Sequence, residues 1–206
     1  SRGLGDVYKR QGIDDRWCVV HATHVTADEL EALARRGVTV GLAPTTEADL
    51  GDGTFPAAAF VARGGSFGIG SDSNTQIDPF AELRQLEWSQ RLALGRRNVL
   101  GAGAGTVGAA LWSAAAHGGA RALAQPVGAL AAGSRADLVV LDTRDAALAE
   151  QRIDDVLDAA IFGPARRPVR DVLVAGRWVV RDGRHLRDDD VLDGFRRALR
   201  AVAQRG

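Results

Sequence analysis

Short apolar runs alternate with amphipathic stretches through the first part of the chain. Three runs have the length and composition of buried strands, at residues 17–20, 38–42 and 67–70. The stretches between and after them predict helices at residues 27–36, 56–63, 78–94 and 106–123. Residues 45–53 are polar and contain glycine, so we expect a loop there. Strands that alternate with helices favour a parallel sheet covered by helices, an α/β fold.

The pattern changes after Gln125 and Pro126. Short strands are predicted at residues 136–142, 169–174, 177–181 and 184–186, with a helix at residues 153–161. Turn signals, Ala-Gly and Asp-Gly, separate the last three strands. A final helix at residues 189–204 carries an apolar stripe of Val191, Phe195, Leu199 and Val202. We therefore expect one unit over residues 12–123 and a small β unit with a C-terminal helix over residues 124–206.

Composition narrows the classes of partner. Apolar residues make up 46% of the 206 residues, and Lys+Arg equal Asp+Glu at 26 each. A chain without net charge has no global field that favours nucleic acid or an anionic membrane. Cys18 is the only cysteine, and no apolar run approaches the roughly 20 residues that span a bilayer. These features indicate a cytoplasmic protein with neither nucleic acid nor membrane as a partner.

Residues 1–11 differ from the remainder of the chain. They contain its only lysine, Lys9, and its only tyrosine, Tyr8, and the chain has no methionine. We expect this segment to be a non-native lead-in to a truncated gene product. The alternative is a native flexible linker.

Polar residues follow two of the predicted strands directly. His21 comes after the first run, and Ser71, Asp72, Ser73 and Asn74 come after the third. Reactive side chains in parallel α/β folds gather at the carboxyl ends of strands, and His and Asp bind zinc and move protons near neutral pH. His21 and Asp72 are therefore candidate catalytic residues. The alternative is a hydrogen-bonded structural histidine and an ordinary turn.

The other three histidines lack such a setting. His24 leads into a Thr26–Glu29 capping box, and we interpret it as structural. His117 lies in an Ala-rich helix and His185 in an Arg/Asp-rich hairpin, neither with a polar cluster.

Several motifs together resemble the amidohydrolase superfamily of metal-dependent deaminases. Residues 19–30 (VVHATHVTADEL) resemble the sixth-strand segment of these enzymes, and residues 68–73 (GIGSDS) their eighth-strand segment, which ends in a metal-binding aspartate. Residues 133–142 and 172–179 resemble their small appended β-sandwich. The resemblance runs from Trp17 to the C-terminus. It implies strands 6–8 of a (β/α)8 TIM-type barrel, followed by part of the appended domain and a C-terminal helix.

Residues 42–53 (LAPTTEADLGDG) are similar to the formimidoylglutamate deiminases of bacterial histidine degradation, where most relatives have a Ser-His-Asn-Pro type of loop. Residues 78–84 (DPFAELR) and 96–100 (RRNVL) support the same subfamily. Glu47 and Asp52 could instead be solvated loop carboxylates. The resemblance implies hydrolytic deamination of N-formimino-L-glutamate to N-formyl-L-glutamate and ammonia.

The resemblance also implies roles for the two candidates. Such enzymes hold one divalent metal, usually zinc, with two histidines of strand 1, one of strand 5 and the strand-8 aspartate. Asp72 would bind the metal and accept the proton of the attacking water, and His21 would hydrogen-bond the attacking oxygen. No His-x-His precedes Trp17, and no His-x-x-Glu is present. We therefore expect little activity from this chain alone.

Two alternatives stay open. One is another amidohydrolase, such as a guanine, cytosine or adenosine-type deaminase or a triazine hydrolase, and the Thr45-Thr46-Glu47 segment argues against it. The other is a non-catalytic module, whose open sheet edge should carry charges or proline. The run Trp-Cys-Val-Val before His21 argues against that. Barrel deaminases of this kind are often dimers, so the resemblance is compatible with a homodimer.

Overall fold

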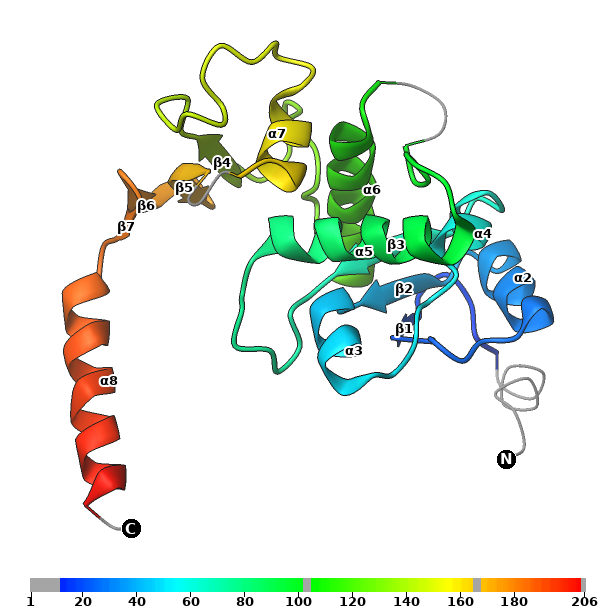
Figure 1. Ribbon diagram of the computed structural model, residues 1–206, viewed down its shortest axis with the longest axis horizontal. Coiled ribbons are helices and arrows are strands. Elements are labelled where there is room, and N and C mark those ends of the chain that lie inside the picture. The colour runs from blue at the N-terminus through cyan, green and yellow to red at the C-terminus, as the bar shows by residue number, and fades with distance from the viewer. Residues whose placement is uncertain (1–11, 102–104, 165–167, 205–206) are drawn as a thin grey trace.

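The computed structural model describes residues 12–101, 105–164 and 168–204. The expectation for residues 1–11 therefore falls outside the described part. The three predicted strands are confirmed, as β1 (Cys18–Val20), β2 (Thr39–Leu42) and β3 (Ser66–Ile69). They pair in parallel in the order β1-β2-β3, with Val19 opposite Val40 and Val40 opposite Phe67. Their carboxyl ends therefore lie along one edge of the sheet (Figure 1).

Helices follow each strand, as the alternating pattern predicts. They are α2 (Ala27–Arg35), α3 (Pro44–Leu50), α4 (Ala57–Val61), α5 (Pro79–Leu94) and α6 (Val107–Ala122). The predicted capping box begins α2, since the Thr26 hydroxyl accepts the Glu29 N–H and the Glu29 carboxylate accepts the Thr26 N–H at 2.9 Å. Asp78 caps α5 in a similar way, and its carboxylate accepts the N–H of Phe80.

The predicted loop at residues 45–53 is wrong for its first part, because α3 occupies Pro44–Leu50. Pro44 stands at the start of the helix, where a missing N–H costs nothing. Gly51 ends it in the left-handed conformation with φ 68°. Thr46 and Glu47 are buried on this helix. Their polar composition suggested a solvated loop, and contacts to distant elements turn it into a packed helix.

Helix α6 lies against β3 with almost no gap between the two backbones. Gly118 faces the carbonyl group of Phe67, and a Cβ placed on Gly68 would lie 3.1 Å from the Cα of Gly119. The ring of Trp112 on α6 stacks on Phe80 of α5 at 5.1 Å between centroids. Buried apolar residues of the sheet and its helices form one core, which includes Leu33, Val40, Phe60, Leu83 and Leu111.

The remaining strands form a separate antiparallel sheet in the order β4-β5-β6-β7. They are β4 (Leu138–Leu141), β5 (Val169–Val174), β6 (Arg177–Arg181) and β7 (Arg184–His185). The two predicted hairpin turns are confirmed, because Ala175, Gly176, Asp182 and Gly183 all have positive φ, between 49° and 78°. This is the backbone that two-residue hairpin loops favour. Helix α7 (Val156–Phe162) lies between β4 and β5 in the chain and packs against α5 and α6.

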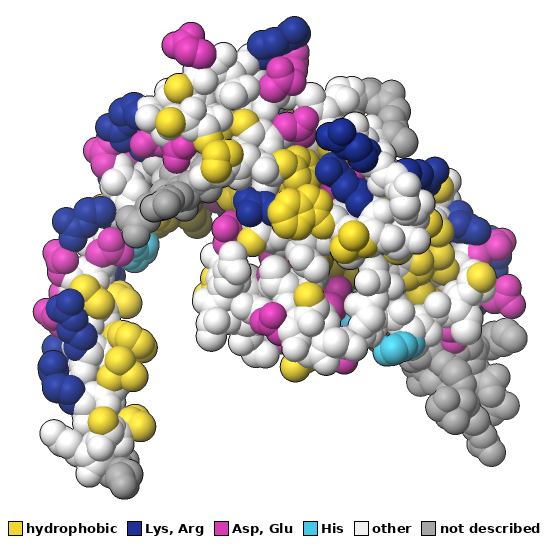
Figure 2. Space-filling model, viewed as in Figure 1, with side chains coloured by type: hydrophobic (Ala, Val, Ile, Leu, Met, Phe, Trp, Pro, Cys, Tyr) yellow, Lys and Arg dark blue, Asp and Glu magenta, His cyan; other side chains and the backbone are white. Residues whose placement is uncertain are grey.

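The last helix, α8 (Asp188–Ala203), confirms the predicted C-terminal helix. It stands apart from both sheets, and its apolar side chains line one side of it (Figures 1 and 2). Val191, Phe195, Leu199 and Val202 are all more than half exposed in the described structure. Throughout the described residues, no helix is long and apolar enough to cross a membrane.

Candidate functional site

Three side chains from three successive βα units meet at the carboxyl edge of the parallel sheet. His21 follows the last residue of β1, Glu47 lies on α3 just after β2, and Asp72 follows β3. His21 Nδ1 lies 3.2 Å from Glu47 Oε1, and His21 Nε2 lies 3.2 Å from Asp72 Oδ2. The imidazole is thus held between two carboxylates. The structure brings together the two candidates chosen from the sequence and adds a third group.

Accessibility differs along this row of side chains. The Glu47 side chain is 6% exposed, whereas those of His21 and Asp72 are 32% and 41% exposed. A small molecule approaching the edge of the sheet would therefore meet His21 and Asp72, and Glu47 would stay behind them. This order separates residues that can contact a substrate from one that supports them.

The backbone at both strand ends has an uncommon conformation. His21, Ala22 and Asp72 have φ of 64°, 51° and 52°, in the left-handed region that residues other than glycine seldom occupy. The N–H of His21 still donates to the carbonyl of Gly41 at 2.8 Å, which extends the β1–β2 pairing to this residue. Such strained positions cluster at functional sites, because surrounding contacts must hold them in place.

Helix α3 attaches to three different elements through three consecutive residues. Thr45 donates to Glu82 of α5 from its N–H at 2.9 Å and from its hydroxyl at 2.5 Å. The Thr46 hydroxyl donates to the carbonyl of Ser71 at 2.8 Å, next to Asp72. Glu47 contacts His21. The Thr-Thr-Glu segment thus fixes the positions of both strand-end residues.

The interpretation of Glu47 as a solvated loop carboxylate is wrong. Its residue is 5% exposed, and its Oε1 accepts the N–H of Ala43 at 3.0 Å as well as facing His21. Asp52, by contrast, is exposed. Glu47 lies on the first turn of α3, four residues after Ala43, which stands between the end of β2 and the start of the helix. On α5, burial raises the pKa of the Glu82 carboxyl above its usual range.

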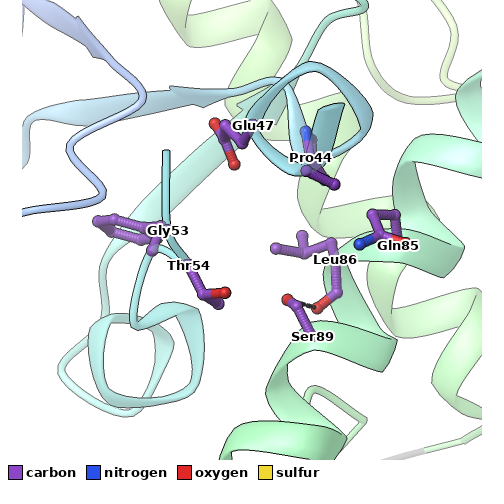
Figure 3. A pocket seen from close by; sticks show the side chains of 9 residues that line it. Pro44, Glu47, Gly53, Thr54, Gln85, Leu86 and Ser89 are labelled. Atoms are coloured by element: carbon purple, nitrogen blue, oxygen red, sulfur yellow. Dashed lines mark hydrogen bonds between the residues drawn. The ribbon is translucent and has the colours of Figure 1, made fainter. Parts of the chain in front are cut away.

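A small cavity of about 50 Å³ lies between α3, the loop that follows it and α5 (Figure 3). Pro44 and Glu47 of α3, Thr54 of the following loop and Leu86 and Ser89 of α5 line it. Binding pockets for small molecules are about 300–1,000 Å³. This cavity is therefore a packing gap behind Glu47, and the exposed edge with His21 and Asp72 remains the candidate reaction centre.

The described residues do not make a complete metal site. Among them, no group of three or more His, Cys, Asp or Glu side chains could hold a metal ion. Catalytic zinc in proteins uses three or more protein ligands, and Asp72 with one adjacent imidazole supplies fewer. His24, His117 and His185 are exposed and lie outside the cluster, as the sequence indicated. The Nδ1 of His117 is 2.7 Å from the carbonyl oxygen of Ser113 on its own helix, and the Nδ1 of His185 accepts the N–H of Arg187.

Curated proteins and solved structures resemble this chain over nearly its full length. It is 49% identical over 204 residues to a formimidoylglutamate deiminase of Pseudomonas aeruginosa, covering 98% of the chain and 44% of that protein. It superimposes on an amidohydrolase from Brucella melitensis with TM-score 0.90 and 43% identity, covering 98% of the chain and 45% of that structure. An adenosine deaminase from Xanthomonas campestris with bound zinc gives TM-score 0.80 at 27% identity, covering all of the chain and 49% of that structure.

The chain therefore spans about half the length of the relatives it matches. The sequence model of the amidohydrolase family matches residues 5–179, which include both strand-end candidates. This match covers most of the chain, and structural neighbours of the same family share its mixed α/β architecture. The chain belongs to the amidohydrolase family.

Proposed function

We propose that the protein with the full length of these relatives hydrolyses N-formimino-L-glutamate to N-formyl-L-glutamate and ammonia. The observation that carries this proposal is the row His21–Asp72 at the strand ends, held by the Thr45–Glu47 segment. The match to a formimidoylglutamate deiminase, with 49% identity, spans 204 residues and 98% of the chain. The chain alone, without the remaining half of such a protein, should release little or no ammonia.

Two residues of this chain would take part in the reaction. Water adds to the formimino carbon and gives one proton to the Asp72 carboxylate, which delivers it to the departing nitrogen. The bond from carbon to that nitrogen then breaks as the new hydroxyl gives up its proton to it, so that ammonia leaves and the formyl carbonyl forms. His21 hydrogen-bonds the attacking oxygen through the ring nitrogen that faces Asp72 and stabilises the charge on the tetrahedral intermediate. Asp72 is also the proposed contribution of this chain to a zinc site, whose other ligands the described residues do not supply.

The proposed architecture assigns β1, β2 and β3 to strands 6–8 of a (β/α)8 barrel. Residues 12–123 would form this barrel part and residues 124–206 the appended domain with its C-terminal helix. A cytoplasmic location and a homodimeric state complete the proposal. The parallel order β1-β2-β3 and the change to antiparallel pairing at β4 support the division into two units.

The experiment starts from the full-length gene, recovered from genomic DNA, and measures ammonia release from N-formimino-L-glutamate. Guanine, cytosine and adenosine serve as control substrates. We expect release from N-formimino-L-glutamate alone, and loss of about 10²–10⁴-fold in kcat for Asp72→Asn and His21→Asn. The matched control is His24→Asn, which changes an exposed histidine three residues away and should retain activity.

Each alternative predicts a different outcome. Ammonia from adenosine or guanine, with none from N-formimino-L-glutamate, would assign the chain to another deaminase. No release from any substrate by a folded, zinc-loaded protein would favour the non-catalytic module. Activity in both Asp72→Asn and His21→Asn would show that the strand-end residues were misassigned even if the substrate is right.

A further inference from the structure

We propose that α8 binds the α8 helix of a second copy of this chain, with the two helices running antiparallel. The contact surface is the apolar stripe of α8, formed by Val191, Phe195, Leu199 and Val202. The inference gives a surface and an orientation to the homodimer of the proposed function. Association can be measured without any substrate, so it does not depend on the reaction.

The stripe has the pattern of a packed helix face. Helix α8 has 16 residues, and none of them is buried, although the structure describes them all. Isolated helices of this length are marginal in water, and helices in proteins are stabilised mainly by packing of their apolar face. The four stripe residues follow one another at spacings of four, four and three, so they form one continuous face (Figure 2). Their side chains are 53–70% exposed, so a partner is needed to cover them.

The charges beside the stripe match those of a second copy. Asp189, Asp193, Arg196 and Arg200 follow at spacings of four, three and four, so they lie along one side of the helix. Arg196 is three residues from Leu199, which places this side next to the stripe. An antiparallel second helix reverses the order, so each pair of aspartates lies beside a pair of arginines. A parallel second helix would place like charges together at both ends, which is unfavourable.

These charges are available to a partner. Arg196 lies 3.6 Å from Asp193 on its own helix, and both side chains are more than half exposed. An exposed pair of this kind contributes little stability, so it does not prevent contacts with a second copy. Within the described part of the chain, Arg200 makes no ion pair. An antiparallel partner would supply its missing carboxylate.

The apolar stripe is also complementary to itself. With a two-fold axis near the centre of α8, Val191 lies beside Val202 of the second copy, and Phe195 lies beside Leu199 of the second copy. The larger side chains meet in the middle and the smaller valines meet at both ends. One patch that fits itself in this way is what a symmetric dimer requires.

The same charges argue against a membrane surface as the partner. Helices that lie in a membrane interface are rich in Lys and Arg on their polar face. In α8, three arginines are outnumbered by four aspartates, Asp188, Asp189, Asp190 and Asp193. The remaining half of the full-length protein is the other possible cover, and the experiment distinguishes it from a second copy.

The test is sedimentation velocity of the 206-residue chain and of the full-length protein. One helix pair is a small contact, so we expect a dissociation constant of about 10–100 μM. Well below this concentration the chain is monomeric and Phe195 stays exposed. Measurements from about 5 to about 500 μM bracket the expected constant. Phe195→Asp, at the centre of the stripe, should raise it by more than about 10-fold.

Charge exchange tests the orientation. The double variant Asp189→Arg with Asp193→Arg makes the side next to the stripe wholly basic, and Arg196→Asp with Arg200→Asp makes it wholly acidic. In an antiparallel pair, each variant alone should be monomeric, and an equal mixture should form a heterodimer, which native mass spectrometry detects. In a parallel pair, both variants would associate as well as the unsubstituted chain, because like charges already face each other there. Arg197→Asp, on the opposite face of α8, is the matched control and should still dimerise.

Three outcomes would overturn the inference. Either protein could be monomeric at every concentration, which for the full-length protein would assign the stripe to its remaining half. A dimer that Phe195→Asp leaves intact would place the contact elsewhere. A monomer that co-sediments with phosphatidylglycerol vesicles through the stripe would assign the surface to a membrane.

The same measurements separate this inference from the proposed function. If Phe195→Asp dissociates the full-length dimer but N-formimino-L-glutamate is not hydrolysed, the proposed function fails and the interface stands. If a full-length protein that stays monomeric hydrolyses this substrate, the interface fails and the function stands.

Discussion

The close packing of α6 on β3 makes a sharp prediction, because two neighbouring glycines of α6 should respond in opposite ways to alanine. A Cβ at position 118 would overlap the carbonyl carbon and oxygen of Phe67 and lie 3.0 Å from the amide nitrogen of Gly68. A Cβ at Gly119 would meet no atom within 4 Å. Gly118→Ala and Gly119→Ala therefore make the same chemical change on the same helix, with and without a steric conflict.

The expected free energies follow from this difference. Alanine is about 1 kcal/mol more favourable than glycine inside a helix, and both variants share that gain. Inserting an atom into a packed core costs typically about 1–3 kcal/mol. Position 118 should lie at the upper end, because the overlapping atoms are backbone and β3 is paired with β2, so the strand cannot move aside. We expect Gly119→Ala to gain up to about 1 kcal/mol and Gly118→Ala to lose about 2 kcal/mol.

Urea-induced unfolding, followed by circular dichroism, measures both values. The same samples report on the site, because β3 carries Asp72 at its end and displacement of the strand should move Asp72 away from His21. The NMR signals of the His21 imidazole should then change in Gly118→Ala and not in Gly119→Ala. If Gly118→Ala proves as stable as Gly119→Ala, the backbones of α6 and β3 are not in the contact described.

Two further predictions concern stability. Phe60 is fully buried, so Phe60→Ala should lower the free energy of unfolding by about 3–5 kcal/mol. Phe195 on α8 is 58% exposed, so Phe195→Ala should change the free energy of unfolding of the 206-residue chain by less than about 0.5 kcal/mol. Urea titration of both variants checks this, and equal losses would mean that α8 packs on the rest of the chain. The N–H of Asp182 and the guanidinium of Arg170 hold the pKa of Asp171 below its usual range. The ionised Asp171 carboxylate therefore stabilises the fold above the ordinary aspartate pKa of about 3.9, and this stabilisation is lost as the pH falls through the lowered pKa. The urea midpoint of Asp171→Asn should thus change less between about pH 6 and pH 2 than that of the unsubstituted protein, and identical pH dependence would contradict this assignment.

Local patterns determined much of the fold. The strands before His21 and Asp72 are apolar runs whose ends are marked by the polar residues themselves, so both candidates could be placed at strand ends without a structure. The capping box at Thr26 and the Ala-Gly and Asp-Gly hairpins are equally local, because the groups that make each turn or cap lie within a few residues of one another. A cap or turn of this kind can be predicted from the sequence, because it needs no contact with a distant part of the chain.

The features that the sequence did not reveal depend on partners far along the chain. Glu47 and His21 are separated by 26 residues, and Thr45 and Glu82 by 37. The sequence marks the Thr-Thr-Glu segment as similar to one subfamily but predicts a loop there and no partner for it. Only the parallel arrangement of β1 and β2 brings the segment against His21 and buries it as a helix. The tight contact at Gly118 likewise requires α6 to lie on β3. The sequence by itself determined which residues stand at the strand ends. The tertiary structure decided which buried carboxylate contacts His21, because burial and hydrogen-bond partners are set by elements that meet only after the chain folds.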